Sequence, residues 1–150
     1  MKTQSQKAAD FEALHKAPGC FVIPNPWDPG SARLLAALGF KALTTTSAGY
    51  ARSIGVTDYK AGREHVLEHI RMMAPAVDIP LAADLENGFG DRPQDCADTL
   101  RLGAEAGLVG GSIEDFTGDT SSPIYSIERA AERVRAAVEA AKNLPFKFML

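Results

Sequence analysis

The sequence predicts an α/β fold with a parallel sheet, because strand-length and helix-length segments alternate along the chain. Short apolar runs recur at residues 20–23, 42–46, 79–83 and 108–113. Segments with the apolar spacing of amphipathic helices separate them. Strands joined by helix-length crossovers lie parallel with right-handed connections, so the sheet is either doubly wound or closed into a barrel.

The composition is that of an ordinary globular domain, and we expect residues 1–150 to form one. Hydrophobic residues make up 45% of the 150 residues, and the formal net charge is -3. The 16 Lys and Arg residues are dispersed and balanced by 19 Asp and Glu residues, which argues against a nucleic-acid partner. No apolar stretch approaches the roughly 20 residues that span a bilayer, so we expect no membrane association and a cytoplasmic location. Cys20 and Cys96 lack metal-type spacing and are expected to be reduced thiols.

The first third of the chain alternates helix and strand twice. An N-terminal helix ends near Pro18, before a compact apolar run at 20–23 that is typical of a buried strand. Asp28 has the position of an N-cap and Pro29 that of the first residue of a second helix. The β-branched strand 42–46 follows and opens into a long loop.

The remainder of the chain repeats this cycle. A helix starts near Arg63, and the strand after it ends at Asp84. Another helix leads to the strand 108–113, a further helix spans about residues 126–142, and the apolar run 146–150 begins a fifth strand. On the last helix, the residues expected to face inward are Ile127, Ala130, Ala131, Val134, Val138 and Ala141.

Acidic residues follow two of the predicted strands at the point where each ends. Asp84 and Glu86 come directly after an apolar run, and residues two apart in an extended segment point the same way. Glu114 and Asp115 repeat the arrangement after the strand 108–113. Because the carboxyl ends of parallel strands share one edge of the sheet, these carboxylates should converge there and suit a hard cation.

The segment after the third of these strands carries the most specific motif. It reads Asp84-Leu85-Glu86-Asn87-Gly88-Phe89-Gly90 and resembles the Asp-x-Asp-x-Gly-aromatic-Gly motif of the isocitrate lyase and phosphoenolpyruvate mutase (phosphonomutase) superfamily. The resemblance covers nearly the whole chain, and several motifs in the family's order make it specific. The further matching segments are residues 39–43, the Thr46-Ser47 turn, residues 55–58 and residues 106–115.

The resemblance implies a parallel (β/α)8 TIM-barrel type of fold and a Mg²⁺-dependent enzyme, with Mn²⁺ as the alternative cation. Such an enzyme cleaves or rearranges a carbon-carbon or carbon-phosphorus bond of a small 2-oxo or 2-hydroxy carboxylate through an enolate, which the cation stabilises as a Lewis acid. The implied roles are metal positions at Asp84, Glu86 and Glu114, substrate contacts from Thr45, Thr46 and Ser47, and catalytic roles for Asp58 and Glu114.

Two departures from the family pattern bear on the reaction. Glu86 replaces the usual second aspartate, which lengthens the arm by one methylene and can shift a direct contact to one through water. The segment 116–125 replaces the Lys-x-Cys-Gly-His loop of the lyase branches, so the cysteine acid is missing. The sequence therefore leaves decarboxylation, hydrolysis and mutase chemistry open beside isocitrate-type cleavage.

The resemblance also implies that about half of a barrel is present. It matches about four β/α units and the start of a fifth strand, and the family's next motif would follow Leu150. We therefore expect the N-terminal part of a TIM barrel, truncated in strand 5, whose unpaired edge favours a homo-oligomer. The alternative to an enzyme is a catalytically inactive fragment or pseudoenzyme that self-associates.

Two other functions are rejected on sequence grounds. His65 and His69 match the inverted zinc-protease pattern, but they lie within an amphipathic helix that packs outside such a barrel. No Gly-x-Gly-x-x-Gly or phosphate-loop lysine motif follows the first strand, which argues against nucleotide binding on a doubly wound sheet.

Overall fold

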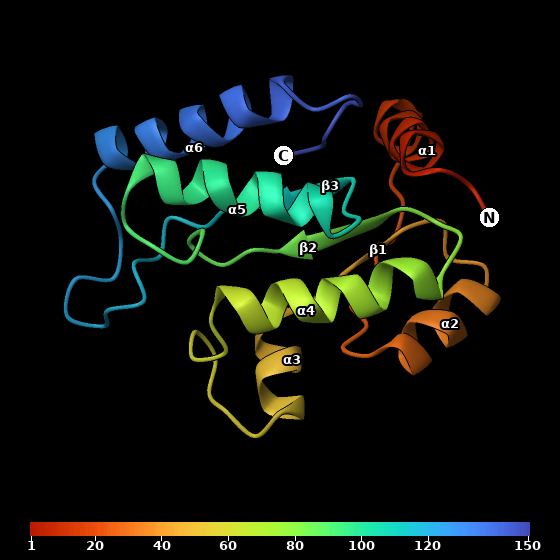
Figure 1. Cartoon of the computed structure of the whole chain (residues 1–150), viewed down its shortest axis with the longest axis horizontal. Coiled ribbons are helices and arrows are strands. Elements are labelled where there is room, and N and C mark those ends of the chain that lie inside the picture. The colour runs from red at the N-terminus through yellow and green to blue at the C-terminus, as the bar shows by residue number, and fades with distance from the viewer.

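The computed structural model describes residues 1–150, and a small parallel sheet lies at its centre (Figure 1). The strands β1 (Leu43–Thr44), β2 (Leu81–Asp84) and β3 (Gly110–Ser112) are hydrogen-bonded in that order, and both pairs are parallel. Helices connect each strand to the next, as parallel pairing requires. The α/β class with a parallel sheet is therefore confirmed, whereas closure into a TIM barrel and the single domain stay predictions.

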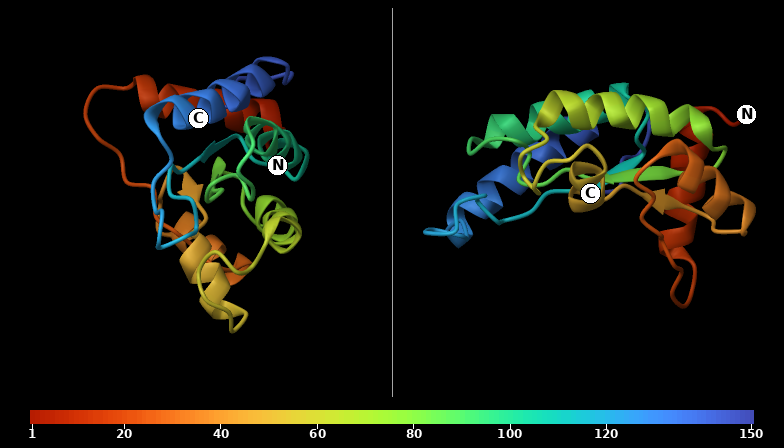
Figure 2. Two further views of the ribbon diagram at one scale, coloured as in Figure 1. Left: turned by 90° about the vertical axis from the view of Figure 1, so that its left-hand side faces the viewer. Right: turned by 90° about the horizontal axis from the view of Figure 1, so that it is seen from below.

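The helices lie around the outside of the strands, as the left view of Figure 2 shows. Thr3, Asp28 and Ser126 each begin a helix by accepting a hydrogen bond from a backbone N–H of its first turn. The predicted N-cap is confirmed, since Asp28 accepts from Ser31 N at 2.6 Å and Pro29 is the first helical residue. The helices are α1 (Gln4–Lys16), α2 (Pro29–Ala37), α3 (Ser47–Ser53), α4 (Arg63–Met73), the 3-10 turn η1 (Ala74–Ala76), α5 (Pro93–Glu105) and α6 (Ile127–Lys142).

The hydrophobic core lies between β2 and the helices α4 and α5. Leu81 and Leu85 are buried on the strand side, and Ile70 and Leu100 come from the two helices with no exposed surface. Burying a large aliphatic side chain contributes about 1.5–3 kcal/mol. This packing fixes the carboxyl end of β2 and therefore the position of the residues that follow it.

The predicted strand at residues 20–23 is wrong, because this run forms no ladder with β1. Val22 is 68% exposed. Pro24 and Pro26 follow directly, and proline has no N–H to donate to a neighbouring strand. One backbone hydrogen bond remains at this edge, from Thr44 N to the Pro24 carbonyl at 3.2 Å. The ladder therefore has three strands where we expected about four.

The long loop predicted after the second apolar run is interrupted by α3. Thr46 is the N-cap of this helix and accepts a hydrogen bond from Gly49 N at 3.1 Å. The polar residues that follow β1 therefore begin a helix, and irregular structure resumes only between α3 and α4.

The face of α6 that was predicted to point inward is largely wrong. Ile127 is 84% exposed, and Val134 and Val138 are also exposed. The residues that are buried on this helix, which packs against α5, are Arg133 and Ala137. A small alanine allows the two helices to approach closely, and a buried arginine breaks the apolar pattern on which the prediction rested.

The apolar run at residues 146–150 begins to pair with the sheet, as predicted. Met149 forms an isolated parallel bridge with Gly110. Gly111 N donates to Met149 O at 2.9 Å, and Met149 N donates to Val109 O at 3.1 Å. The start of a further strand therefore lies beside β3.

Other sequence features have structural positions. His69 stacks on Tyr50 with 4.0 Å between the ring centroids, and its Nε2 lies 2.9 Å from the Trp27 carbonyl. Its burial, which lowers the pKa of the imidazole, and these contacts give it a packing role. Cys20 is exposed, Cys96 is buried, and both are free. No helix combines the length and the apolar character that crossing a bilayer requires.

Candidate functional site

Asp84, the last residue of β2, connects the ends of two neighbouring strands. Its Oδ2 accepts hydrogen bonds from the backbone N–H of Ser47 at 3.1 Å and from the Ser47 hydroxyl at 2.7 Å. Its Oδ1 accepts from Glu86 N at 3.0 Å. Ser47 is the first residue of α3 and lies three residues after the end of β1. These three hydrogen bonds fix the orientation of the Asp84 carboxylate.

Glu86 is a buried carboxylate without a full set of partners. Glu86 is 2% exposed, and its Oε1 atom has no hydrogen-bond partner. Burial, and then the nearby charges of Asp58, Asp84 and Glu114, raise the pKa of this carboxyl to about 7. The backbone of Glu86 has a φ of 49°, so a turn rather than strand alternation brings it towards Asp84. Three other carboxylates therefore lie within electrostatic reach of Glu86 at this end of the sheet.

Glu114 follows β3 and is connected to the same turn. Its backbone N–H donates to the Glu86 carbonyl at 2.8 Å, and its carboxylate accepts a short hydrogen bond from the Tyr59 hydroxyl. Burial and this carboxylate raise the pKa of Tyr59, so the phenol stays protonated and acts as a donor. One oxygen of Glu114 is thereby engaged and oriented.

The three residues expected to contact substrate differ in what they do in the structure. Thr45 is buried, and its N–H donates to the Ala82 carbonyl at 3.1 Å, which extends the pairing of β1 with β2. The Thr46 hydroxyl is used as the N-cap of α3. Of the three, Ser47 contacts another predicted site residue, Asp84. Their roles towards a substrate stay predictions.

Asp58 lies on the exposed segment between α3 and α4. Its Oδ1 accepts a hydrogen bond from the N–H of its neighbour Tyr59 at 3.1 Å. Its charge is among those that raise the pKa of Glu86, which places it within electrostatic reach of the buried carboxylate. The structure therefore brings Asp58 towards the other acidic residues, and its catalytic role stays a prediction.

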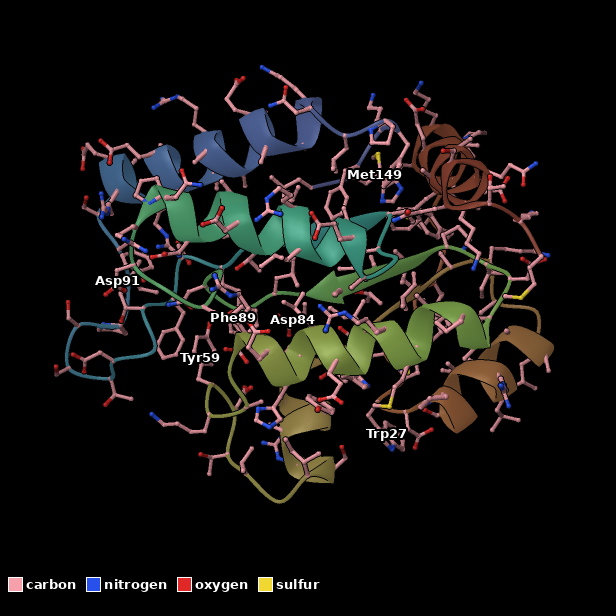
Figure 3. All side chains as sticks on the ribbon, viewed as in Figure 1. Trp27, Tyr59, Asp84, Phe89, Asp91 and Met149 are labelled. Atoms are coloured by element: carbon pink, nitrogen blue, oxygen red, sulfur yellow. The ribbon has the colours of Figure 1, made fainter.

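A cavity of about 520 Å³ opens in front of Glu86. Figure 3 shows Asp84, Tyr59 and Phe89 near one another at the end of β2, with Trp27 lying apart from them. Asp84, Glu114 and the Thr46-Ser47 turn do not line this cavity. The lining comes from the segments around residues 59–64, 86–90 and 117–119, and it includes Tyr59, Lys60, Arg63, Glu86, Phe89 and Thr117.

The acidic cluster fits a divalent cation bound in part through water. The unpartnered Oε1 of Glu86 is a buried acceptor that lacks a positive partner. No three acidic, His or Cys side chains come together at the spacing of direct metal ligands. Mg²⁺ keeps several of its waters and needs only one or two carboxylates, so the donor set suits that ion. Asp84, Glu86 and Glu114 are the residues that would hold it.

Sequence reasoning missed two residues that support this region. Tyr59 lies next to Asp58 in the sequence, but no pattern indicated that its hydroxyl meets Glu114. Arg133 is 1% exposed on α6, and its guanidinium donates to the carbonyls of Asn87 and Gly90. The sequence signal for Arg133 was its position four residues before Ala137, which puts both residues on the same side of the helix.

The chain is similar to a defined group of proteins. The family model described as phosphoenolpyruvate phosphomutase matches residues 11–150. The 2-methylisocitrate lyase of Escherichia coli (strain K12) is 31% identical over 119 residues, covering 74% of this chain and 40% of the lyase. The crystal structure of a candidate lyase/mutase from Burkholderia cenocepacia J2315 has a TM-score of 0.95 with this chain and is 56% identical to it in sequence. The match covers 97% of this chain and 53% of that one.

A more distant solved structure carries ligands. It is a phosphonopyruvate hydrolase in complex with oxalate and Mg²⁺, with a TM-score of 0.80 and 25% identity, covering 93% of this chain and 48% of that one. The chain thus spans about half the length of these three proteins, from 40% of the Escherichia coli lyase to 53% of the Burkholderia protein.

Proposed function

Because the chain belongs to the phosphoenolpyruvate phosphomutase family, within the isocitrate lyase and phosphoenolpyruvate mutase superfamily, we propose that it carries the N-terminal half of a Mg²⁺-dependent active site. The proposed reaction cleaves or rearranges a carbon-carbon or carbon-phosphorus bond in a small 2-oxo or 2-hydroxy carboxylate. When bound, the cation would supply Lewis-acid stabilisation of the negative charge that develops on the substrate oxygen. Mn²⁺ would serve the same purpose.

The observation that carries this proposal is the buried, unpartnered carboxylate of Glu86. An ionised carboxylate at this depth, close to three others, is unfavourable unless a positive charge joins it. A divalent cation supplies that charge, and the fixed orientation of Asp84 favours binding with little reorganisation. We assign metal binding to Asp84, Glu86 and Glu114.

The remaining residues have proposed roles towards the substrate. Thr45, Thr46 and Ser47 would contact its oxygens from the end of β1, and Asp58 and Glu114 would act as the catalytic carboxylates. The segment 116–125 contains no cysteine to serve as a general acid. We therefore favour decarboxylation, hydrolysis or mutase chemistry over the cysteine-dependent cleavage of isocitrate-type substrates.

Isothermal titration with Mg²⁺ and oxalate, which mimics an enolate, tests the metal site. The wild-type chain should bind Mg²⁺, and oxalate should bind only when Mg²⁺ is present. Asp84→Ala should weaken Mg²⁺ binding at least about 10–100-fold, because it removes an oriented carboxylate. Asp98→Ala on α5 is the matched control, since that side chain is 37% exposed and lies in a surface ion pair. Absence of binding heat from the wild type, or equal affinities for both variants, would refute the assignment.

A second candidate function, an inactive fragment that self-associates, is favoured by one surface. The outer face of α6 exposes Ile127, Val134 and Val138. A groove of about 430 Å³ continues this surface. Exposed apolar patches of this kind mark association surfaces. The apolar residues that line the groove are Val138, Ala141, Leu144, Phe146, Phe148, Met149 and Leu150.

Light scattering coupled to size-exclusion chromatography tests the second candidate. A homo-oligomer that Val138→Lys converts to a monomer, which still unfolds in one cooperative transition, would support association through this surface. The conservative control is Val138→Ala, which keeps the charge of the face unchanged. A wild-type monomer with one cooperative melting transition would exclude the self-associating fragment.

A further inference from the structure

The loop that carries Glu86 has an unusual backbone. Glu86, Gly88 and Phe89 have φ values of 49°, 76° and 58°. The left-handed region is sparsely populated by residues other than glycine, and such a conformation persists only when its surroundings over-determine it. A Cβ at Gly88 would lie 2.9 Å from Cys96 Sγ, so this turn also packs closely on α5. The contacts that hold the loop therefore determine where the Glu86 carboxylate lies.

Two helices supply those contacts. From α5, the Thr99 hydroxyl donates to the Gly88 carbonyl at 2.8 Å. From α6, Arg133 Nη1 donates to the Gly90 carbonyl at 2.7 Å, and Nη2 donates a short hydrogen bond to the Asn87 carbonyl. The carbonyls of Asn87, Gly88 and Gly90 in this one loop thus accept hydrogen bonds from donors on packed helices. Rigid elements of this kind place a site more accurately than a free loop does.

Arg133 has no acidic partner, although it is almost completely buried. It is 1% exposed and takes part in none of the ion pairs of the chain. Its guanidinium lies 4.1 Å from the centroid of the Tyr125 ring, and its charge faces the two loop carbonyls. Burying a charge is costly, and a hydrophobic residue of similar volume at such a position often stabilises a fold as well or better. Helix packing alone therefore does not account for an arginine here.

Tyr125 extends this contact to the segment between β3 and α6. Its hydroxyl donates to Asp91 Oδ1 at 2.6 Å and accepts from Asn87 Nδ2 at 3.2 Å. Asn87 Nδ2 also lies 3.3 Å from the Thr117 carbonyl. The segment 117–125 and the Glu86 loop are thereby connected on the side facing Arg133.

We propose that Arg133 is a positioning residue for the metal site, which acts by fixing the backbone of the loop from Asn87 to Gly90 and so the carboxylate of Glu86. Tyr125 supports it by covering the guanidinium and bonding to both ends of the loop. The inference rests on the proposed function for the metal, but its effect on the loop is a property of the metal-free chain. Arg133 itself touches neither the cation nor the substrate.

Hydrogen exchange and Mg²⁺ titration on the 150-residue chain test the proposal. In metal-free Arg133→Met, the amides of residues 86–90 should exchange at least about ten-fold faster, while amides in β2 and α4 keep their protection. The Mg²⁺ affinity should fall about 10–100-fold. Arg133→Lys, which retains the charge and one donor group, should show smaller changes in both measurements. Arg135→Met, an exposed residue on the same helix, should match the wild type.

The outcomes separate this proposal from the proposed function. Unchanged loop exchange in Arg133→Met overturns the positioning role, whatever the wild type does with Mg²⁺. Faster exchange throughout the molecule, equal in the Met and Lys variants, also overturns it, because the arginine would then be a general structural residue. A wild type that fails to bind Mg²⁺ overturns the proposed function alone. If Arg133→Met does not fold, Arg133→Lys carries the test, because its single, shorter ammonium group does not reproduce the two guanidinium bonds to the Gly90 and Asn87 carbonyls. Unchanged exchange of residues 86–90 in that variant then overturns the positioning role.

Discussion

The core beneath β2 and the loop that continues β2 differ in the side chains they bury, which are apolar in the core and charged around the loop. In the core, Leu81, Leu100 and Ile70 belong to one buried apolar cluster, and their side chains carry no polar atom. In the loop, the carboxylate of Glu86 is buried with one unpartnered oxygen. Next to the loop, Arg133 of α6 buries its charge against the loop carbonyls. The core is built for stability, whereas the loop keeps groups that a stability criterion alone would remove.

The difference extends to the backbone. The strand and helices of the core have ordinary dihedral angles, but Glu86 and Phe89, two and five residues after the end of β2, take positive φ values. Backbone strain therefore begins where the apolar packing of the core ends. Regions of this kind are typical of binding sites, where unfavourable local conformations are retained for what they position. Substitutions on the two sides of this boundary should therefore change stability in opposite directions.

The largest expected effect comes from the core. Leu100→Ala should lower the free energy of unfolding by about 2–5 kcal/mol, because Leu100 has no exposed surface and its removal leaves a cavity between α5 and β2. Leu34→Ala on α2 is the matched control, since Leu34 is 61% exposed and its truncation should change stability by less than about 1 kcal/mol. Urea denaturation measures both. Equal losses would mean that the core is not packed as described.

The elements of this core could be predicted from the sequence because they depend on local patterns. The strand ending at Asp84, the helix starting at Arg63 and the cap at Asp28 follow from apolar spacing and from residues close in the chain. The run at 20–23 has the same apolar signal. It failed as a strand because the backbone meets β1 only at Pro24, and the prolines at 24 and 26 have no N–H with which to continue a ladder.

The candidate site could be predicted only in part. The positions of Asp84 and Glu114 at strand ends follow from the parallel topology, and the convergence of the acidic residues was expected. The contacts that orient them join residues far apart in the chain. Tyr59 meets Glu114 across 55 positions, and Arg133 meets Gly90 across 43. No local pattern encodes such a pairing, and the buried face of α6 is displaced by one residue from the predicted one, to Arg133 and Ala137.

A second prediction addresses the loop through its unsatisfied carboxylate. In the unfolded chain the pKa of Glu86 should be near its ordinary value of 4.5, whereas in the folded chain burial and neighbouring charges raise it to about 7. Between these values the folded state binds more protons, so stability falls as the pH rises through this range. The ionised form is disfavoured by up to about 3 kcal/mol. Glu86→Gln should therefore stabilise the metal-free chain at pH 8 by up to this amount.

Urea denaturation without metal at several pH values measures this effect. The advantage of Glu86→Gln should shrink towards about pH 4.5, where the wild-type carboxyl is also protonated. Glu68→Gln, at an exposed position on α4, should behave as the wild type at every pH. The same Glu86→Gln variant should lose Mg²⁺ affinity, and the wild-type affinity should rise as the pH passes about 7, because the ligand must be deprotonated. A destabilised Glu86→Gln at pH 8 would contradict the description of the loop.

The smallest expected effect lies at the boundary between the two regions, where Ser47 holds Asp84. Ser47→Ala removes the hydroxyl donor at 2.7 Å but leaves the backbone donor at 3.1 Å, so unfolding should become easier by only about 1 kcal/mol. The Mg²⁺ affinity should fall about ten-fold, because the Ser47 hydroxyl orients the carboxylate of Asp84 that is proposed to bind the metal. Ser53→Ala on the same helix also loses a hydroxyl bond of 2.7 Å, but to the Tyr50 carbonyl, and it should leave Mg²⁺ binding unchanged. Chemical denaturation and Mg²⁺ titration of the two variants distinguish a hydrogen bond that only stabilises the fold from one that also orients the Asp84 carboxylate for metal binding. Equal Mg²⁺ affinities in the two variants would mean that Ser47 contributes to the stability of the fold and not to metal binding.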